Sequence, residues 1–209
     1  MTTKTVRKRR ELEQRRQEVL EVALDLFSRK GFEQTSMAEI AEQAGFAVGT
    51  LYTLFKDKNA LYHRLIGAAI TEFEQKLSEV LAGPDDEVRK VERYIETKAA
   101  LFVKHRSLAR IYFGQATWSM VTPLVGSDRE IQVAMGRMLH LLESALSAGM
   151  RKRLLLKMDP KLLALGLEGL SNAFMLELMG RTDGYSADDC AEAVKKIFFE
   201  QIRLKAAAF

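Results

Sequence analysis

The stretch over residues 36–62 constrains the fold most, because it predicts two short helices joined by a tight turn. Ser36 followed by Glu39 matches a capping box, in which a hydroxyl and a carboxylate satisfy free amide groups at a helix start. Gly45 predicts a sharp end to this helix, since glycine adopts a left-handed backbone conformation at little cost. A second short helix is expected over residues 48–54.

The spacing of Ala41, Gly45 and Leu51 indicates how this pair of helices packs. A small residue at Ala41 lets the helices cross closely, Gly45 makes the bend, and Leu51 anchors the second helix in the core. This arrangement is typical of a helix-turn-helix, whose second helix enters the major groove of DNA. Because short motifs also match by chance, an ordinary helical hairpin inside a larger bundle is the alternative.

Basic residues are concentrated at the start of the chain, within residues 1–16. They are Lys4, Arg7, Lys8, Arg9, Arg10, Arg15 and Arg16. Such an arm suits contact with phosphates or entry into a minor groove, and the alternative is a solvated tail. Next to a predicted helix-turn-helix, the arm favours nucleic acid as the partner.

The composition indicates an all-α protein without a membrane span. The 209 residues are 47% hydrophobic and 29% charged, and they include only three prolines. The sequence shows no apolar run of about twenty uncharged residues and no apolar signal segment at its start. Cys190 is the single cysteine, which agrees with a reducing compartment, and we expect it to be a small buried residue. We therefore expect a cytoplasmic protein.

Apolar periodicity predicts the remaining helices. A first helix is expected over about residues 9–30, and a long helix over residues 58–81 is interpreted as a connector to a second domain. Further helices are expected from about residue 85 to 105, from 107 to about 122, and from 127 to 152.

The last two predicted helices, over about residues 159–180 and 186–205, carry more apolar surface than one buried face requires. This surplus predicts a subunit interface. The alternative is that the first of the two helices is buried wholly within its own chain.

A set of aromatic, aliphatic and methionine side chains in the middle and late helices could line an adaptable apolar pocket. The predicted ligand-binding residues are Phe102, Ile111, Tyr112, Trp118, Met120, Met135, Met138 and Phe174. Together they favour a small hydrophobic effector, and the alternative for any one of them is plain core. The three histidines lack ligand-type spacing, and no nucleophile elbow, Walker loop or dinucleotide fingerprint is present. We therefore predict no catalytic residue, no metal site and no cofactor.

The segment TSMAEIAEQAGFAVGTLYTLFKDKNALYHRL resembles the DNA-binding head of the TetR family of bacterial transcription regulators, over about residues 12–65. The resemblance implies about nine helices: an N-terminal three-helix head with a helix-turn-helix, and a larger C-terminal bundle. It also implies a two-fold dimer built from the last two helices and a small-molecule pocket in the C-terminal domain. We expect a DNA-binding head over residues 1–57, and a ligand-binding and dimerisation domain over residues 58–209.

By the same resemblance, particular positions are expected to meet DNA. They are Ser36, Ala47, Val48, Gly49, Thr50, Tyr52, Thr53 and Lys58. Tyr52 and Lys58 match the family's phosphate clamps, and Gly49 allows close approach to the DNA backbone. Ala47 departs from a serine that commonly caps the second helix, so we expect that helix to lack a side-chain cap. Val48, Thr53 and Leu54 make the expected recognition surface unusually apolar, suited to thymine methyl groups.

These features predict a ligand-responsive DNA-binding transcriptional regulator. The expected form is a homodimeric repressor that a small hydrophobic molecule releases from a double-stranded DNA operator. Two alternatives remain: a DNA-binding factor without a ligand, and an enzyme built on a helical bundle.

Overall fold

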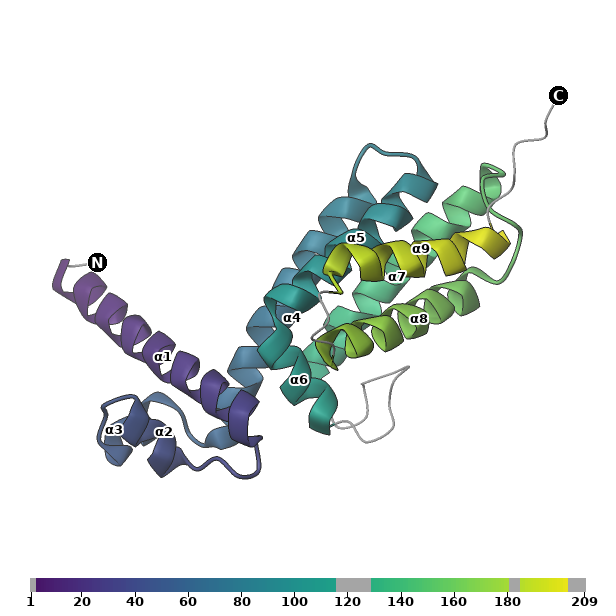
Figure 1. Cartoon of the computed structure of the whole chain (residues 1–209). Coiled ribbons are helices and arrows are strands. Elements are labelled where there is room, and N and C mark those ends of the chain that lie inside the picture. The colour runs from purple at the N-terminus through teal and green to yellow at the C-terminus, as the bar shows by residue number, and fades with distance from the viewer. Residues whose placement is uncertain (1–2, 116–128, 181–184, 203–209) are drawn as a thin grey trace. The chain divides into compact units, whose positions relative to one another are not determined.

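The computed structural model describes residues 3–115, 129–180 and 185–202. Within these ranges the chain forms nine α-helices (Figure 1), which confirms the predicted all-α fold. The helices are α1 (Thr3–Lys30), α2 (Met37–Gln43), α3 (Val48–Leu54), α4 (Lys58–Ala82), α5 (Glu87–Lys104), α6 (Arg106–Gln115), α7 (Arg129–Arg151), α8 (Pro160–Gly180) and α9 (Ala187–Ile202).

The chain divides into two compact units. The first, called the head here, comprises the chain up to Ala68 together with Ser107–Gln115; the second, called the body, comprises the rest. The sequence predicted a boundary at residue 57, whereas this division falls inside α4. The physical reason is that Leu61, in the first turn of α4, is completely buried in the head core. The beginning of the connector helix is therefore part of the head.

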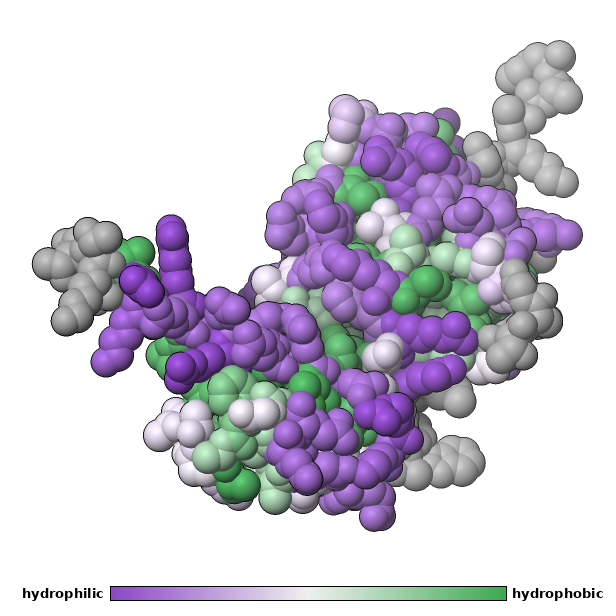
Figure 2. Space-filling model, turned by 60° about the vertical axis from the view of Figure 1, so that its left-hand side comes forward, coloured by the Kyte–Doolittle hydropathy of each residue, from purple (hydrophilic) through white to green (hydrophobic). Residues whose placement is uncertain are grey.

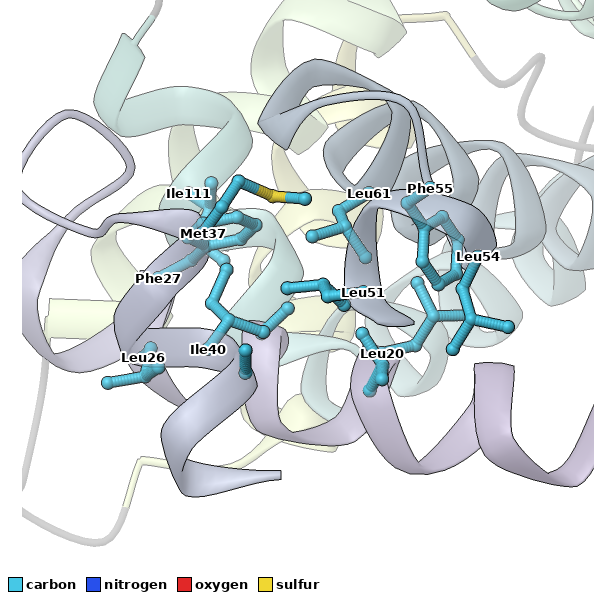
Figure 3. Packing of buried hydrophobic residues seen from close by; sticks show 13 residues of the cluster. Leu20, Leu26, Phe27, Met37, Ile40, Leu51, Leu54, Phe55, Leu61 and Ile111 are labelled. Carbon is cyan, nitrogen blue, oxygen red and sulfur yellow. The ribbon is translucent and has the colours of Figure 1, made fainter. Parts of the chain in front are cut away.

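The head is built on one apolar core to which α1, α2, α3, α4 and α6 all contribute (Figure 3). Its largest fully buried side chains are Leu26, Phe27, Ile40, Leu51 and Leu61. Leu51 is fully buried and points toward Ile40 and Leu61 in the close-up (Figure 3). Burying a leucine contributes about 1.5–3 kcal/mol, so this side chain holds α3 firmly on the head.

The basic N-terminal stretch is helical, which corrects the predicted start of the first helix. α1 begins at Thr3 rather than near residue 9, so the expected arm continues the helix. Arg7 pairs with Glu11 at 2.9 Å across one helical turn, a spacing that supports isolated helices modestly. In the space-filling view the surface of this stretch is largely, but not entirely, hydrophilic (Figure 2). The basic side chains from Arg7 to Arg10 are exposed on this helix.

The body is a bundle in which α5, α7, α8 and α9 pack on one another. Its fully buried side chains include Ile95, Leu142, Leu146, Leu167 and Val194. Cys190 is buried as expected, with its Sγ 3.7 Å from the Sδ of Met175. Burial raises the pKa of the Cys190 thiol to about 11, so it stays protonated at neutral pH.

Side-chain caps begin several helices. Asp57 accepts a hydrogen bond from the amide of Ala60 at 2.8 Å, Asp159 accepts one from Leu162 at 3.2 Å, and the hydroxyl of Ser186 accepts one from Asp189 at 3.1 Å. These bonds satisfy amides that a helix start leaves without an intrahelical acceptor. The predicted extension of α6 to about residue 122 lies outside the described residues beyond Gln115.

α8 is apolar on most of its surface, as expected. Among the described residues it is the one helix that is long and apolar enough to cross a membrane, judged by length and composition only. Within its most apolar stretch, 44% is buried in the protein. A core helix of a bundle passes the same test, so the property does not distinguish the two.

Candidate nucleic-acid interface

The first helix of the motif begins at the predicted cap. The Oγ of Ser36 accepts a hydrogen bond from the amide of Glu39 at 3.2 Å, which is the hydroxyl half of a capping box. The carboxylate half differs from the prediction, because Glu39 accepts a hydrogen bond from the ammonium of Lys30 instead. Ser36 therefore fixes the start of α2, and the pair of Lys30 and Glu39 ties α2 to the end of α1.

The turn between the two helices is a Schellman motif. Gly45 has a φ of +71°, the amide of Gly45 donates to the carbonyl of Glu42 at 3.1 Å, and the amide of Phe46 donates to Ala41 at 2.9 Å. This pair of bonds satisfies the last carbonyls of a helix, and the left-handed residue between them favours glycine. Gly45 thus makes the bend that its position in the sequence predicted.

α3 has one buried and one exposed side. Leu51 and Leu54 face the core, whereas Tyr52 is 53% and Val48 41% exposed. Gly49 and Thr53 are exposed as well, and Thr50 is half-buried. The outward residues at spacings of three and four lie on one face of the helix. The structure therefore brings Val48, Gly49, Tyr52 and Thr53 together on a surface free to meet a ligand.

The polar groups of this face are few. Ala47 makes no side-chain bond at the start of α3, as its methyl side chain predicts. The hydroxyl of Thr53 donates to the carbonyl of Thr50 at 2.6 Å, which leaves its oxygen as an acceptor. A Cβ added at Gly49 would meet no atom within 4 Å, so the position is open to close approach.

Lys58 is placed differently from the expected phosphate clamp. Its Nζ donates to the carbonyls of Phe32 at 2.6 Å, Thr35 at 2.9 Å and Glu33 at 3.3 Å. The ammonium also lies 4.4 Å from the centre of the Phe32 ring, which is a cation–π contact. Lys58 therefore holds the turn between α1 and α2.

The predicted ligand-binding residues fall in both units of the described structure. In the body, Phe102 and Met138 are buried, Met135 and Phe174 are half-buried, and Phe102 packs edge-on against Phe73 at 5.5 Å. Ile111 instead belongs to the apolar core of the head. Trp118 and Met120 lie outside the described residues, as does the side chain of Tyr112.

Sequence reasoning missed a buried polar cluster between α5 and α8 of the body. The ammonium of Lys98 lies 2.8 Å from one carboxylate oxygen of Glu168, and the hydroxyl of Tyr94 donates to the other at 2.7 Å. Lys98 is 4% exposed, and the nearby Ser171 on α8 is completely buried without a hydrogen-bond partner for its Oγ. Burial and the adjacent carboxylate raise the pKa of Tyr94 well above its usual value. A lysine at a core position of the apolar stripe of α5 is the signal that could have revealed the cluster.

The described parts of the chain show no cluster of side chains arranged for a metal site. No group of three histidine, cysteine, aspartate or glutamate side chains there could hold a metal ion. His105 is partly buried and lies 2.9 Å from a carboxylate oxygen of Glu72, so this pair joins the end of α5 to α4.

A short helix that follows a glycine turn, buries Leu51 and Leu54 and exposes its other face has the arrangement of a helix-turn-helix DNA-binding domain. The model of the family described as "Bacterial regulatory proteins, tetR family" matches residues 19–65. Over residues 19–65 the chain therefore matches the DNA-binding region of the TetR family of regulators, as the sequence resemblance predicted.

Known proteins agree with this assignment. The chain is 44% identical over 57 residues to the HTH-type transcriptional regulator AcrR of Shigella flexneri, covering 27% of this chain and 26% of AcrR. It is 37% identical over 65 residues to the uncharacterized HTH-type transcriptional regulator YfiR of Bacillus subtilis, covering 31% of this chain and 32% of YfiR. The matches to these relatives thus span about a third or less of their length.

The likeness to solved structures extends over the whole fold. A transcriptional regulator of the TetR/AcrR family from Thermobifida fusca superposes with a TM-score of 0.70 at 19% identity. The match covers 90% of this chain and 98% of that protein. At this identity the likeness establishes the fold of the body but carries no information about its ligand.

Proposed function

We propose that this protein is a homodimeric transcriptional repressor that a small hydrophobic molecule releases from its DNA operator. The observation that carries the proposal is the exposed face of α3, with Tyr52 and Val48 outward and Leu51 fully buried. A helix held in this way can enter a major groove without unfolding the head.

The proposed DNA-binding surface consists of α3 and the residues that begin the two short helices. Val48, Thr50 and Thr53 would face base edges, with the apolar groups suited to thymine methyls. The exposed phenol of Tyr52 and the hydroxyl of Ser36 would meet phosphates, and Ala47 and Gly49 allow the DNA backbone to approach closely. The exposed basic side chains at the start of α1 supply further phosphate contacts.

The proposed dimer uses α8 and α9. Two apolar side chains support it, because Leu162 on α8 is 66% exposed and Ile197 on α9 is 49% exposed. A protein with two identical heads reads two half-sites, roughly 34–36 Å apart or a multiple of that distance. Leu162→Asp should convert the dimer into monomers, whereas Val133→Asp, at a 48% exposed position on α7, should leave the dimer intact. Equal dimer fractions in the two variants would argue against this interface.

The proposed effector site lies in the body. The apolar and adaptable side chains of the proposed site are those of Phe102, Met135, Met138 and Phe174. A polar end group of the effector would form hydrogen bonds with the cluster of Lys98 and Glu168. To act as a switch, the effector must bind more tightly to the form of the protein that is released from DNA. A coupling free energy of about 1–3 kcal/mol between the two sites is typical.

The experiment that tests the function is selection of bound duplexes from a random pool, repeated with hydrophobic compounds. The proposal expects a two-fold symmetric site and loss of binding with an effector. A factor without a ligand would give the same site but no response to any compound, and no small molecule would be found by mass spectrometry of the purified protein. An enzyme would give no selected site.

A further inference from the structure

We propose that Lys56 contacts DNA phosphates and that Lys58 acts as a positioning residue, which fixes the turn between α1 and α2. The inference rests on the proposed DNA-binding function and assigns two neighbouring lysines opposite roles.

The hydrogen-bond donors of Lys58 are used inside the head. A lysine ammonium has three N–H donors and no acceptor. The Nζ of Lys58 lies within hydrogen-bond distance of three carbonyl oxygens, those of Phe32, Glu33 and Thr35. Lys58 could therefore donate a hydrogen bond to a phosphate only by breaking its hydrogen bond with one of these carbonyls.

Lys58 is also the first residue of α4. A cation at a helix N-terminus is disfavoured by the helix dipole, so local helix formation does not explain a lysine there. The three carbonyls and the ring of Phe32 do explain it, because they surround the ammonium with negative charge density.

The turn that Lys58 holds determines where α2 begins. Gly31 has a φ of +87° at the end of α1, and the hydroxyl of the buried Thr35 donates to its carbonyl at 2.9 Å. The next residue, Ser36, is the cap at which α2 begins. Lys58 thus joins the start of α4 to the turn that sets where α2, and after it α3, are placed.

Lys56 has the properties that Lys58 lacks. It is exposed, and no hydrogen bond or ion pair holds it among the residues that the structure describes. It follows the C-cap of α3, Phe55, by one residue, so it lies at the end of the proposed recognition helix. All three N–H donors of Lys56 can therefore bind DNA phosphates without breaking a hydrogen bond of the folded protein.

The test compares matched variants at the two positions, using the slope of log affinity against log salt for a selected duplex. Removing one phosphate contact reduces the slope by about 0.9, so Lys56→Met should reduce it by about 1.8 for a dimer. Lys56→Arg should keep the wild-type slope, since a guanidinium also pairs with phosphate. Lys58→Met should lower the affinity but leave the slope unchanged. Lys58→Arg should behave like Lys58→Met, because a planar guanidinium does not fit three carbonyls arranged for an ammonium.

Two readouts need no DNA and keep the positioning role separate from the DNA-binding proposal. In the free wild-type protein, the ammonium of Lys58 should give a slowly exchanging NMR signal, and that of Lys56 should not. In both Lys58 variants, amide exchange at Thr35 and Met37 should accelerate, whereas Lys56→Met should leave it unchanged.

The outcomes are distinct. A slope reduced in Lys58→Met but not in Lys56→Met, or a Lys58 ammonium exchanging as fast as that of Lys56, would overturn the inference. If no duplex is bound at all, the proposed function fails, and the ammonium signal still decides whether Lys58 holds the turn.

Discussion

The head and the body bury different kinds of side chain. Among the described residues of the head, Thr35 is the buried polar residue, and the rest of the core is apolar. The body buries Glu87, Lys98, Ser171 and Asn172 within its helices. An apolar core tolerates little rearrangement because it is close-packed, whereas buried polar groups are costly when left unpaired and respond to any change of partner. The head therefore gives α3 a close-packed apolar support, and the buried polar groups lie in the body, where we place the proposed effector site.

The largest effect is expected from the centre of the head core. Leu51→Ala removes a fully buried side chain and should reduce the free energy of unfolding of the head by about 2–5 kcal/mol. Chemical denaturation followed by circular dichroism measures this change. Leu12→Ala, at a 41% exposed position on α1, should cost less than about 0.5 kcal/mol. A similar loss for both variants would contradict the view of the head as a support built on one core.

The next effect distinguishes the buried charges of the body. Lys98→Met leaves the carboxylate of Glu168 without its ammonium partner and should cost about 3 kcal/mol of unfolding free energy. Replacing both residues, as Lys98→Met with Glu168→Leu, removes the orphaned charge and should restore part of the loss. Denaturant unfolding of the single and double variants measures the coupling. A double variant that is less stable than the single one would contradict the assigned pairing.

Acid should weaken the body through its carboxylates. Hydrogen bonds from Lys104 and His105 lower the pKa of Glu72, those from Arg137 lower the pKa of Glu74, and that from Lys152 lowers the pKa of Glu87. Since the folded protein binds protons at these groups less readily than the unfolded chain does, the stability they contribute is present above the usual glutamate pKa of about 4.3. It is lost as the pH falls below that value, toward the lowered pKa values of the folded protein.

Urea unfolding at pH 6 and at pH 4, followed by methyl NMR signals, checks this prediction. Signals of Leu142 in the body should show the larger loss of stability on acidification, compared with those of Leu51 in the head. An equal loss in both units would remove the distinction between them.

The smallest effect concerns helix ends. The head has glycine at its left-handed positions, Gly31 and Gly45, whereas in the body Arg153, two residues after the end of α7, has a φ of +58°. A left-handed conformation costs a residue with a side chain roughly 1–2 kcal/mol. After allowing for the greater freedom of glycine in the unfolded chain, Arg153→Gly should raise the unfolding free energy by about 0.5–1 kcal/mol. A decrease, measured by thermal denaturation, would show that the guanidinium contributes more than the strain costs.

The sequence predicted the parts of the structure that depend on local signals. Ser36, Gly45 and Leu51 specified the cap, the turn and the anchor of the helix-turn-helix, because each acts through its own backbone or its own burial. The same local signals located α8 and α9. The DNA-binding roles of Val48, Tyr52 and Thr53 remain predictions that their exposure supports.

The parts that were missed depend on interactions between distant segments. Lys58 is separated from Phe32 by 26 residues, so its carbonyl partners could not be found from its own neighbourhood. The pairing of Lys98 with Glu168 spans 70 residues and two helices. Ile111 was placed in a ligand pocket because its apolar spacing fits either core or pocket, and periodicity does not say which unit a helix joins.

The most direct test of the central claim is the affinity of Gly49→Glu for the selected duplex. A Cβ at this position on α3 meets no atom within 4 Å, so the head should fold normally while a negative charge faces the DNA. We predict a loss of affinity of roughly a hundredfold or more, with an unchanged melting temperature, because like charges brought together cost several kcal/mol. Gly136→Glu, a matched glycine with equal free space on α7, should bind like the wild type. If Gly49→Glu keeps its affinity for the duplex, α3 is not the helix that binds DNA and the account is wrong.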